Sequence, residues 1–124
     1  MRHLSKLLIL IPAALLASCT TPKPAPDAFL HAEQAIEAAV QAGAEQHSPV
    51  ELRFAREKLA EANKGMELKQ YDKSIVLIEQ SEINSELAIE KSRTAVTRAR
   101  VAESTRDYEV LKADFEATYG EDAR

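Results

Sequence analysis

The chain has 124 residues, a formal net charge of −4, one cysteine and no tryptophan. This length fits one small domain, and the acidic balance argues against nucleic acid as a partner, because nucleic-acid binders concentrate Lys and Arg. A single cysteine excludes an internal disulfide and a thiolate metal cage. The chain is rich in Ala, Glu, Lys and Arg, a bias typical of helices with narrow contacts rather than of a large mixed core.

The N-terminus has the pattern of a targeting segment. Arg2 and Lys6 supply positive charge ahead of an apolar run at residues 7–17. That run is too short to span a bilayer as a helix, which needs about 20 residues, and its length is typical of a signal peptide. We therefore predict that residues 1–18 are a signal peptide.

The predicted signal peptide leads into Leu-Ala-Ser-Cys at residues 16–19. This tetrapeptide resembles the lipobox of bacterial lipoproteins, in which the cysteine receives a diacylglycerol and, after cleavage, an acyl chain on its amine. The resemblance implies that Cys19 is lipidated, and two or more chains make anchoring stable. Thr20 stands where an Asp commonly retains Gram-negative lipoproteins at the inner membrane. The resemblance therefore implies an outer-membrane anchor with the domain facing the periplasm. The alternatives are a cleaved secretory signal with a chance cysteine, or an uncleaved anchor.

The segment after Cys19 is rich in proline. Pro22, Pro24 and Pro26 alternate with other residues, which favours an extended polyproline II conformation with a reach of roughly 20 Å for residues 20–26. We interpret residues 19–26 as the lipidated cysteine and a tether between lipid and domain. A proline motif that binds a partner is the alternative.

Apolar spacing predicts an all-α domain over residues 27–124. The first helix is expected at residues 27–42, where alanines recur every three or four residues and Gly43 follows as a terminator. Residues 43–47 are then expected to form a loop.

The second helix is predicted at residues 49–68 and has the sharpest start signal in the chain. Ser48 can cap it, Pro49 suits its first position, and Glu51 can complete a capping box. Its predicted buried face has apolar residues at alternating spacings of three and four: Leu52, Ala55, Leu59, Ala62 and Met66.

The third helix is predicted at residues 71–118, after a turn near residues 68–71. The buried face changes register there, as expected where a chain turns back, and one continuous helix is the alternative. The new face consists mainly of small residues: Tyr71, Ser74, Ile78, Ser81, Ser85, Ala88, Ser92, Ala95, Ala99 and Ala102. We therefore predict a three-helix antiparallel arrangement with a long, coiled-coil-like C-terminal helix.

A second apolar stripe on the third helix lies roughly opposite the small-residue face. The helix would be ~70 Å long and its neighbour only ~30 Å, so a simple hairpin cannot cover it. An uncovered apolar row tends to mark an interaction site. We predict a surface for self-association or partner docking, made of Val101, Tyr108, Leu111 and Phe115. Fraying of the last turns is the alternative.

No pattern typical of catalysis or cofactor binding is present. His31 and His47 lie on separate predicted elements, whereas zinc needs three or four converging ligands. The glycines are isolated, which excludes a phosphate-binding loop. The serines lie mainly on the small-residue face, where small volume explains them better than nucleophilic catalysis does. We expect no enzyme activity, no cofactor and no metal site.

The order of these features resembles a known family. After a lipobox, a proline-rich tether and an Ala-rich helix, residues 49–62 read Pro-x-x-Leu-x-x-Ala-x-x-Lys-Leu-x-x-Ala. This looks like the bacterial lipoprotein family that carries domain of unknown function 4398. The resemblance implies a helical envelope protein without catalytic residues. Some members add an OmpA-like peptidoglycan-binding domain. This sequence shows none, so peptidoglycan is an alternative partner without support in the residues.

A weaker resemblance concerns the start of the third helix. Tyr71, Ser74, Ile78 and Ser81 resemble the second helix of a tetratricopeptide repeat, although a peptide-binding array needs about three repeats. Two interpretations of function follow. The first is a lipid-anchored, non-enzymatic structural or adaptor protein of the envelope. The second is a tetratricopeptide-like module that binds a peptide or partner.

Overall fold

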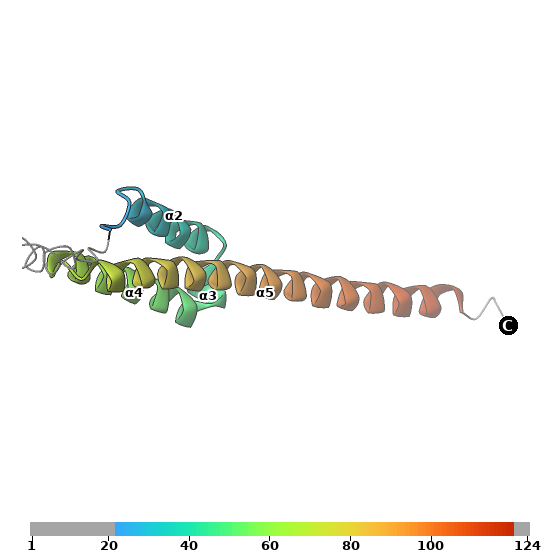
Figure 1. The fold of residues 1–124 in the computed structure, drawn as a ribbon. Coiled ribbons are helices and arrows are strands. Elements are labelled where there is room, and N and C mark those ends of the chain that lie inside the picture. The colour runs from blue at the N-terminus through green and yellow to red at the C-terminus, as the bar shows by residue number, and fades with distance from the viewer. Residues whose placement is uncertain (1–21, 121–124) are drawn as a thin grey trace, which may run out of the picture.

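A computed structural model describes residues 22–120, and every regular element in this part of the chain is a helix. Figure 1 shows one long helix with the others gathered along its first half. The fold is the all-α arrangement that the sequence predicts, with four helical segments in place of three. These are α2 (Ala28–Gln41), α3 (Ala44–His47), α4 (Pro49–Glu67) and α5 (Tyr71–Tyr119).

The core consists of two clusters of small and medium apolar side chains. One cluster joins Ala32, Leu59, Ala62, Leu77 and Ile78, and the other joins Ala39, Ala44, Leu52 and Ala88. Along α2 and α5 the two clusters follow in the same order, and along α4 they follow in the opposite order. The three long helices therefore alternate in direction, and the alanines of α2 allow the helices to approach closely.

The chain reverses between α4 and α5 through a Schellman motif. Lys69 adopts a left-handed φ of 57°, its N–H donates to the Met66 carbonyl at 3.0 Å, and the Gln70 N–H donates to the Gly65 carbonyl at 2.8 Å. These two bonds satisfy the last carbonyls of α4 and end it. α4 and α5 are thus two helices and not one continuous helix.

Gly65 lies where α4 and α5 approach each other closely. A Cβ atom at this position would lie 2.4 Å from Ser74 Oγ. Gly65 is buried in the last turn of α4, so it serves helix packing there as well as the reversal that follows. A larger residue would push the two helices apart where the hairpin begins.

The prediction of a loop at residues 43–47 is wrong, because residues 44–47 form the helical turn α3. Gly43 ends α2 as predicted, with a φ of 82°. Its carbonyl then accepts the N–H groups of Gln46 and His47, both at 3.1 Å. Ala44 is fully buried in the second core cluster, which holds the turn against α5. Four residues are too few to show a helical period in sequence.

The described part of the proline-rich segment is held against the bundle. Pro24 is buried and lines a hollow with Ile75 and Ile78 of α5. It also lines a second hollow with Phe29 and Met66. The length of roughly 20 Å expected for residues 20–26 as a free tether is therefore an overestimate, because the segment already contacts the bundle at Pro24.

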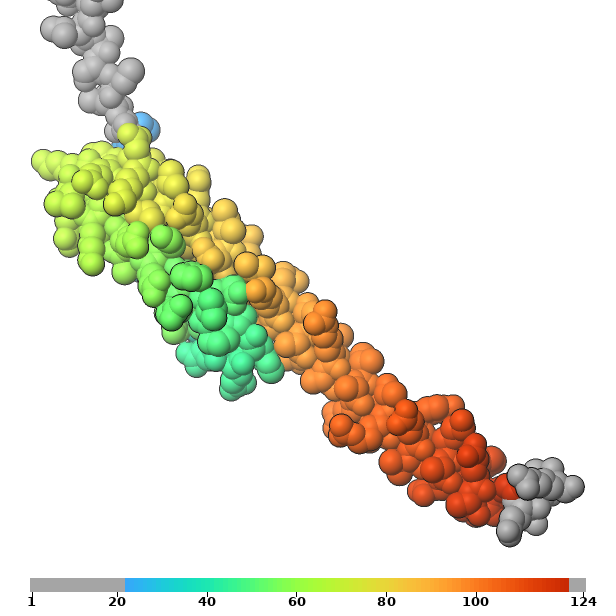
Figure 2. Space-filling view, turned by 90° about the horizontal axis from the view of Figure 1, so that it is seen from below, coloured from blue at the N-terminus to red at the C-terminus, as the bar shows by residue number. Residues whose placement is uncertain are grey.

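α5 changes character after Ser92. Its buried residues end there, and from residue 93 to 120 every side chain is exposed except the half-buried Ala95. The small-residue face was expected to continue to Ala102, but Ala99 and Ala102 are exposed because α4 begins only at Pro49. We name residues 93–119 the arm. It is ~40 Å long, and Figure 2 shows it as a single rod leaving the bundle of α2, α3, α4 and the first half of α5.

Candidate functional site

The predicted lipidation site Cys19 and the predicted signal peptide, residues 1–18, lie outside the described residues. Lipidation therefore stays a prediction. Within residues 22–120, no helix has both the length and the apolar composition of a membrane span. The described surfaces that can carry a function are those of the bundle and the arm.

Serine hydroxyls join α5 to the backbone of α4. Ser74 Oγ donates to the Ala62 carbonyl at 3.1 Å, and Ser81 Oγ donates to the Ala55 carbonyl at 2.8 Å. Both serines are fully buried, so each hydroxyl needs a partner inside the protein. The two contacts are seven residues apart on both helices, and together they fix one antiparallel register.

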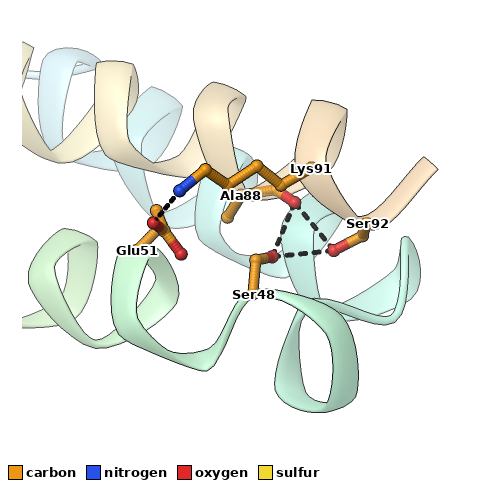
Figure 3. Close-up of polar contacts among 5 residues, drawn as sticks. All are labelled: Ser48, Glu51, Ala88, Lys91 and Ser92. Atoms are coloured by element: carbon orange, nitrogen blue, oxygen red, sulfur yellow. Dashed lines mark hydrogen bonds and ion pairs between the residues drawn. The ribbon is translucent and has the colours of Figure 1, made fainter. Parts of the chain in front are cut away.

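In the next contact of this register the donor comes from the α4 side and the acceptor from α5. Ser48 Oγ, just before α4, donates to the Ala88 carbonyl of α5 at 2.7 Å. Ser92 Oγ donates to the same carbonyl at 2.7 Å, and the two hydroxyl oxygens are 2.8 Å apart (Figure 3). The buried serines therefore do more than supply small volume. Their hydroxyls donate to backbone carbonyls, whereas a serine nucleophile needs a base beside it.

The predicted capping box at the start of α4 is wrong. Ser48 makes no side-chain cap hydrogen bond, because its hydroxyl is turned toward α5. Glu51 likewise turns to α5, where it forms a hydrogen-bonded ion pair with Lys91 (Figure 3). Only Pro49, in the first turn, has its predicted role. A pattern typical of local capping serves tertiary contacts here.

The pKa of the Glu51 carboxyl is lowered from its ordinary value. The hydrogen bond from the Lys91 ammonium lowers the pKa of this carboxyl, and a hydrogen bond from its own backbone N–H lowers it further. Burial opposes these effects, and the positive charge of Lys91 adds to them. The carboxylate is stabilised as a structural anion, not held protonated as a general acid would be.

The two histidines of the predicted domain do not meet. Both are exposed, and His31 Nε2 lies 3.9 Å from Asp27 Oδ2 on the neighbouring turn. His47 ends α3. No group of three or more His, Cys, Asp or Glu within residues 22–120 is placed to hold a metal ion.

The residues of the predicted partner surface lie together on one face of the arm. Val101, Tyr108, Leu111 and Phe115 are between 60% and 69% exposed. With Ser104 they repeat at spacings of three and four, and we name these five residues the arm stripe. The ring centroid of Phe115 lies 5.1 Å from that of Tyr119, which widens the apolar surface at its end. A partner for this face stays a prediction.

The same apolar face continues along the bundle half of α5. Val76, Ile83 and Leu87 are exposed and lie in line with the arm stripe at about 100° per residue. The buried serines face α4 on the other side of the helix. The bundle therefore leaves Val76, Ile83 and Leu87 exposed in line with the arm stripe.

Local interactions alone hold the arm in helical form. Lys112 Nζ lies 3.9 Å from Glu116 Oε1, and Thr97 and Thr105 bond back to the carbonyls of Arg93 and Val101. Pairs four residues apart contribute only a few tenths of a kcal/mol each. Most helical stability in proteins comes from packing an apolar face, and the arm packs its face on nothing within its own described chain.

Reasoning from sequence missed the turn α3, the ion pair of Glu51 with Lys91 and the contact of Ser48 with α5. A signal for the contact of Ser48 was present, because Ser74, Ser81 and Ala88 repeat every seven residues, as do Ala62, Ala55 and Ser48 in the reverse direction. Aligning these two repeats gives the observed register of α4 and α5.

A comparison with protein families identifies one match. The family model for a domain of unknown function, DUF4398, matches residues 27–104. The match covers the bundle and the first part of the arm, and it ends before Tyr108, Leu111 and Phe115. Neither a curated protein nor a solved structure matches the chain.

Proposed function

Since the chain belongs to the family of the domain of unknown function DUF4398, we propose its role from its predicted address and its exposed surface. It is a non-enzymatic structural or adaptor protein of the cell envelope, anchored through lipidated Cys19 to the outer membrane with its helices in the periplasm. The observation that carries the adaptor role is the arm, which stands clear of the bundle with its apolar stripe exposed.

The geometry suits a protein that reaches away from its anchor. Pro24 is docked beside Ile75 and Ile78 near the start of α5, whereas the arm lies at the far end (Figure 1). α5 has 49 residues, so its two ends are ~70 Å apart. The arm stripe is therefore held far from the point where the tether meets the bundle.

A non-catalytic role accords with the chemistry of the bundle. The buried hydroxyls of Ser74 and Ser81 are committed to backbone carbonyls, and the shifted carboxyl of Glu51 is committed to Lys91. These groups hold the helices in register.

A second candidate is the tetratricopeptide-like module that binds a peptide. The observation in its favour is Pro24, which is buried and lines a hollow with Ile75 and Ile78 at the start of α5. In that role the hollow beside Ile75 and Ile78, rather than the arm, would receive the partner.

The variant Cys19→Ser tests the predicted address. It should abolish lipidation, leave a slower-migrating precursor and release the chain from the membrane fraction. Normal processing and membrane attachment of this variant would show that the lipobox interpretation is wrong.

Cross-linking in intact envelopes tests the adaptor role. A photo-activated cross-linker at Leu111, on the arm stripe, should capture a defined partner. The same group at Val110, which is also apolar and exposed but lies on the other face of the helix, should capture little. Equal capture at both positions would remove the stripe as a docking surface. Capture only from a probe at Ile75 would favour the peptide-binding module instead, and recovery with peptidoglycan alone would favour a purely structural role.

A further inference from the structure

We propose that the arm stripe binds a second copy of this chain and that the two arms pair antiparallel in a two-stranded coiled coil. The inference rests on the proposed function, since it names a partner for the arm. Three features of α5 carry it: the spacing of the stripe, the alternation of large and small residues along it, and the distribution of charge on either side.

The spacing of the arm stripe is that of a coiled-coil seam. Val101, Tyr108 and Phe115 are seven residues apart, and Ser104 and Leu111 each follow three residues after the first two. Apolar residues at these two heptad positions pack as knobs into holes of a facing helix. The seam continues to Thr94 and Thr97 on one side and to Thr118 on the other.

The sizes of the seam residues favour an antiparallel pairing. When Val101 faces Leu111 of the second copy, Ser104 faces Tyr108 of that copy. In the same register Phe115 faces Thr97 of the second copy, so each aromatic ring meets a small residue. A parallel, in-register pairing would instead stack Tyr108 on Tyr108 and leave Ser104 against Ser104. Large residues set against small ones fill the interface evenly.

Charge is divided between the two halves of the arm. Residues 93–106 hold four arginines and one acid, and residues 107–120 hold four acids and one lysine. An antiparallel pair sets the basic half of each copy against the acidic half of the other. A parallel pair would set like charge against like, which disfavours that arrangement.

One charged pair makes this complementarity specific. Arg100 and Asp114 both lie one residue before a seam position, and in the antiparallel register Arg100 of one copy approaches Asp114 of the other. Two-fold symmetry produces this contact twice. Neither side chain takes part in an ion pair within the described residues, so both are available across the interface.

The bundle does not obstruct this dimer. The serine contacts to α4 lie on the face of α5 away from the stripe, and only the arms overlap. The two bundles then sit at opposite ends. The tether ends of the two α5 helices are roughly 100 Å apart, which lays the dimer along a membrane that holds both anchors.

Sedimentation of the full lipidated chain in detergent tests the seam. Wild type should show a concentration-dependent dimer. The double variant Tyr108→Glu with Phe115→Glu should be monomeric with its helix content kept, and Val110→Glu, off the seam, should dimerise like wild type. A strictly monomeric wild type, or a dimer that survives the double variant, would overturn the proposal.

A charge exchange tests the direction of the pairing. Arg100→Glu should raise the dissociation constant roughly tenfold, because two ion pairs become repulsive. Adding Asp114→Arg to the same chain should restore dimerisation, because the pairs re-form with opposite sign. Failure of the second change to restore the dimer would overturn the antiparallel register.

Cysteine cross-linking of two differently tagged copies in intact envelopes gives an independent measure of direction. A copy with Val101→Cys should form a disulfide with a copy carrying Leu111→Cys, while the wild-type chain serves as the control for Cys19. Disulfides between two Val101→Cys copies, or none at all, would overturn the antiparallel pairing. The proposed function would survive that outcome if the arm captured another protein, and it would fail separately if Cys19→Ser left the chain on the membrane.

Discussion

The two halves of α5 are one continuous helix with different environments. In residues 74–92 one face of the helix is buried against the bundle, and the hydroxyls of Ser74 and Ser81 bond to carbonyls of α4. In residues 93–119 nothing in the described chain covers the helix, and its largest apolar side chains are exposed on the other face. Both halves have the same helical backbone. They differ in whether another helix packs on the small-residue face.

The comparison shows that the start of α4 determines where α5 changes from buried to exposed. Ala88, Ala95, Ala99 and Ala102 continue one small-residue face, yet only the first of them is fully buried, because α4 begins at Pro49. Small residues therefore mark a contact face only where a second helix reaches them. The following variants test whether the two halves respond differently to the same change.

Overpacking the bundle half of α5 should have the largest effect on stability. Ala88→Leu should lower the free energy of unfolding by about 1–3 kcal/mol, because Ala88 is fully buried and extra methylenes must displace its neighbours. Ala99→Leu, on the same face but in the arm, should leave the unfolding midpoint unchanged. Equal effects of the two variants in denaturant titrations would contradict the claim that packing of α5 ends at Ser92.

The contact of Ser48 with α5 should contribute about 1 kcal/mol. Ser48→Ala removes one donor, but the Ala88 carbonyl keeps its bond from Ser92, so no buried acceptor is left unpaired. Thr97→Ala, which removes an exposed back-bond in the arm, should change stability by less than about 0.5 kcal/mol. Ser48→Asp distinguishes a role of Ser48 in the contact with α5 from a role as the local cap of α4. Asp caps helices as well as Ser does, so a fully stable Ser48→Asp would contradict the assignment.

The ion pair of Glu51 and Lys91 should make the bundle half sensitive to pH. The pKa of Glu51 is lowered in the folded chain, so its stabilising effect is present at neutral pH and is lost as pH falls through that lowered pKa. Glu51→Gln should therefore cost about 1 kcal/mol or less at neutral pH, and the two unfolding midpoints should converge in acid. Glu116→Gln, in the exposed pair of the arm, should change stability by less than about 0.5 kcal/mol at neutral pH. A constant gap between wild type and Glu51→Gln across the range would be inconsistent with this assignment.

The turn between α4 and α5 is the one position in this series where a substitution should raise stability. Lys69 adopts a left-handed conformation that glycine reaches without the steric cost of a Cβ atom. Lys69→Gly should raise stability by up to about 1 kcal/mol. The matched change Lys64→Gly, inside the last turns of α4, should lower stability by about 1 kcal/mol. Thermal unfolding of both variants checks the sign, and a loss in Lys69→Gly would show that the turn carries no strain.

The long-range pattern of the chain could be predicted from sequence, whereas the roles of single polar groups could not. Helical spacing predicted the buried residues Leu52, Ala55 and Leu59 of α4 and the change of face before Tyr71. The same reasoning assigned Ser48 and Glu51 to a cap, because a capping box and a tertiary contact need the same residue types at the same spacing. Only the position of α5 decides between them.

Burial in the arm was predictable only in part. The helix lengths predicted that α4 cannot cover all of α5, and the exposure of Val101 and Tyr108 agrees with that arithmetic. The end of the covered region at Ser92 was not predictable, because it depends on the start of α4 and on the contact of Ser48 with Ser92, which the capping pattern did not indicate.

Hydrogen exchange of the full lipidated chain, measured by mass spectrometry over a range of concentrations, tests the central claim most directly. We predict slow, concentration-independent exchange for the amides of residues 74–92. In residues 93–119 we predict fast exchange in dilute samples and growing protection as the chain is concentrated, because partnering buries the arm stripe. Arm amides as strongly protected as the bundle at every dilution would show that the arm packs on its own bundle and would contradict the account.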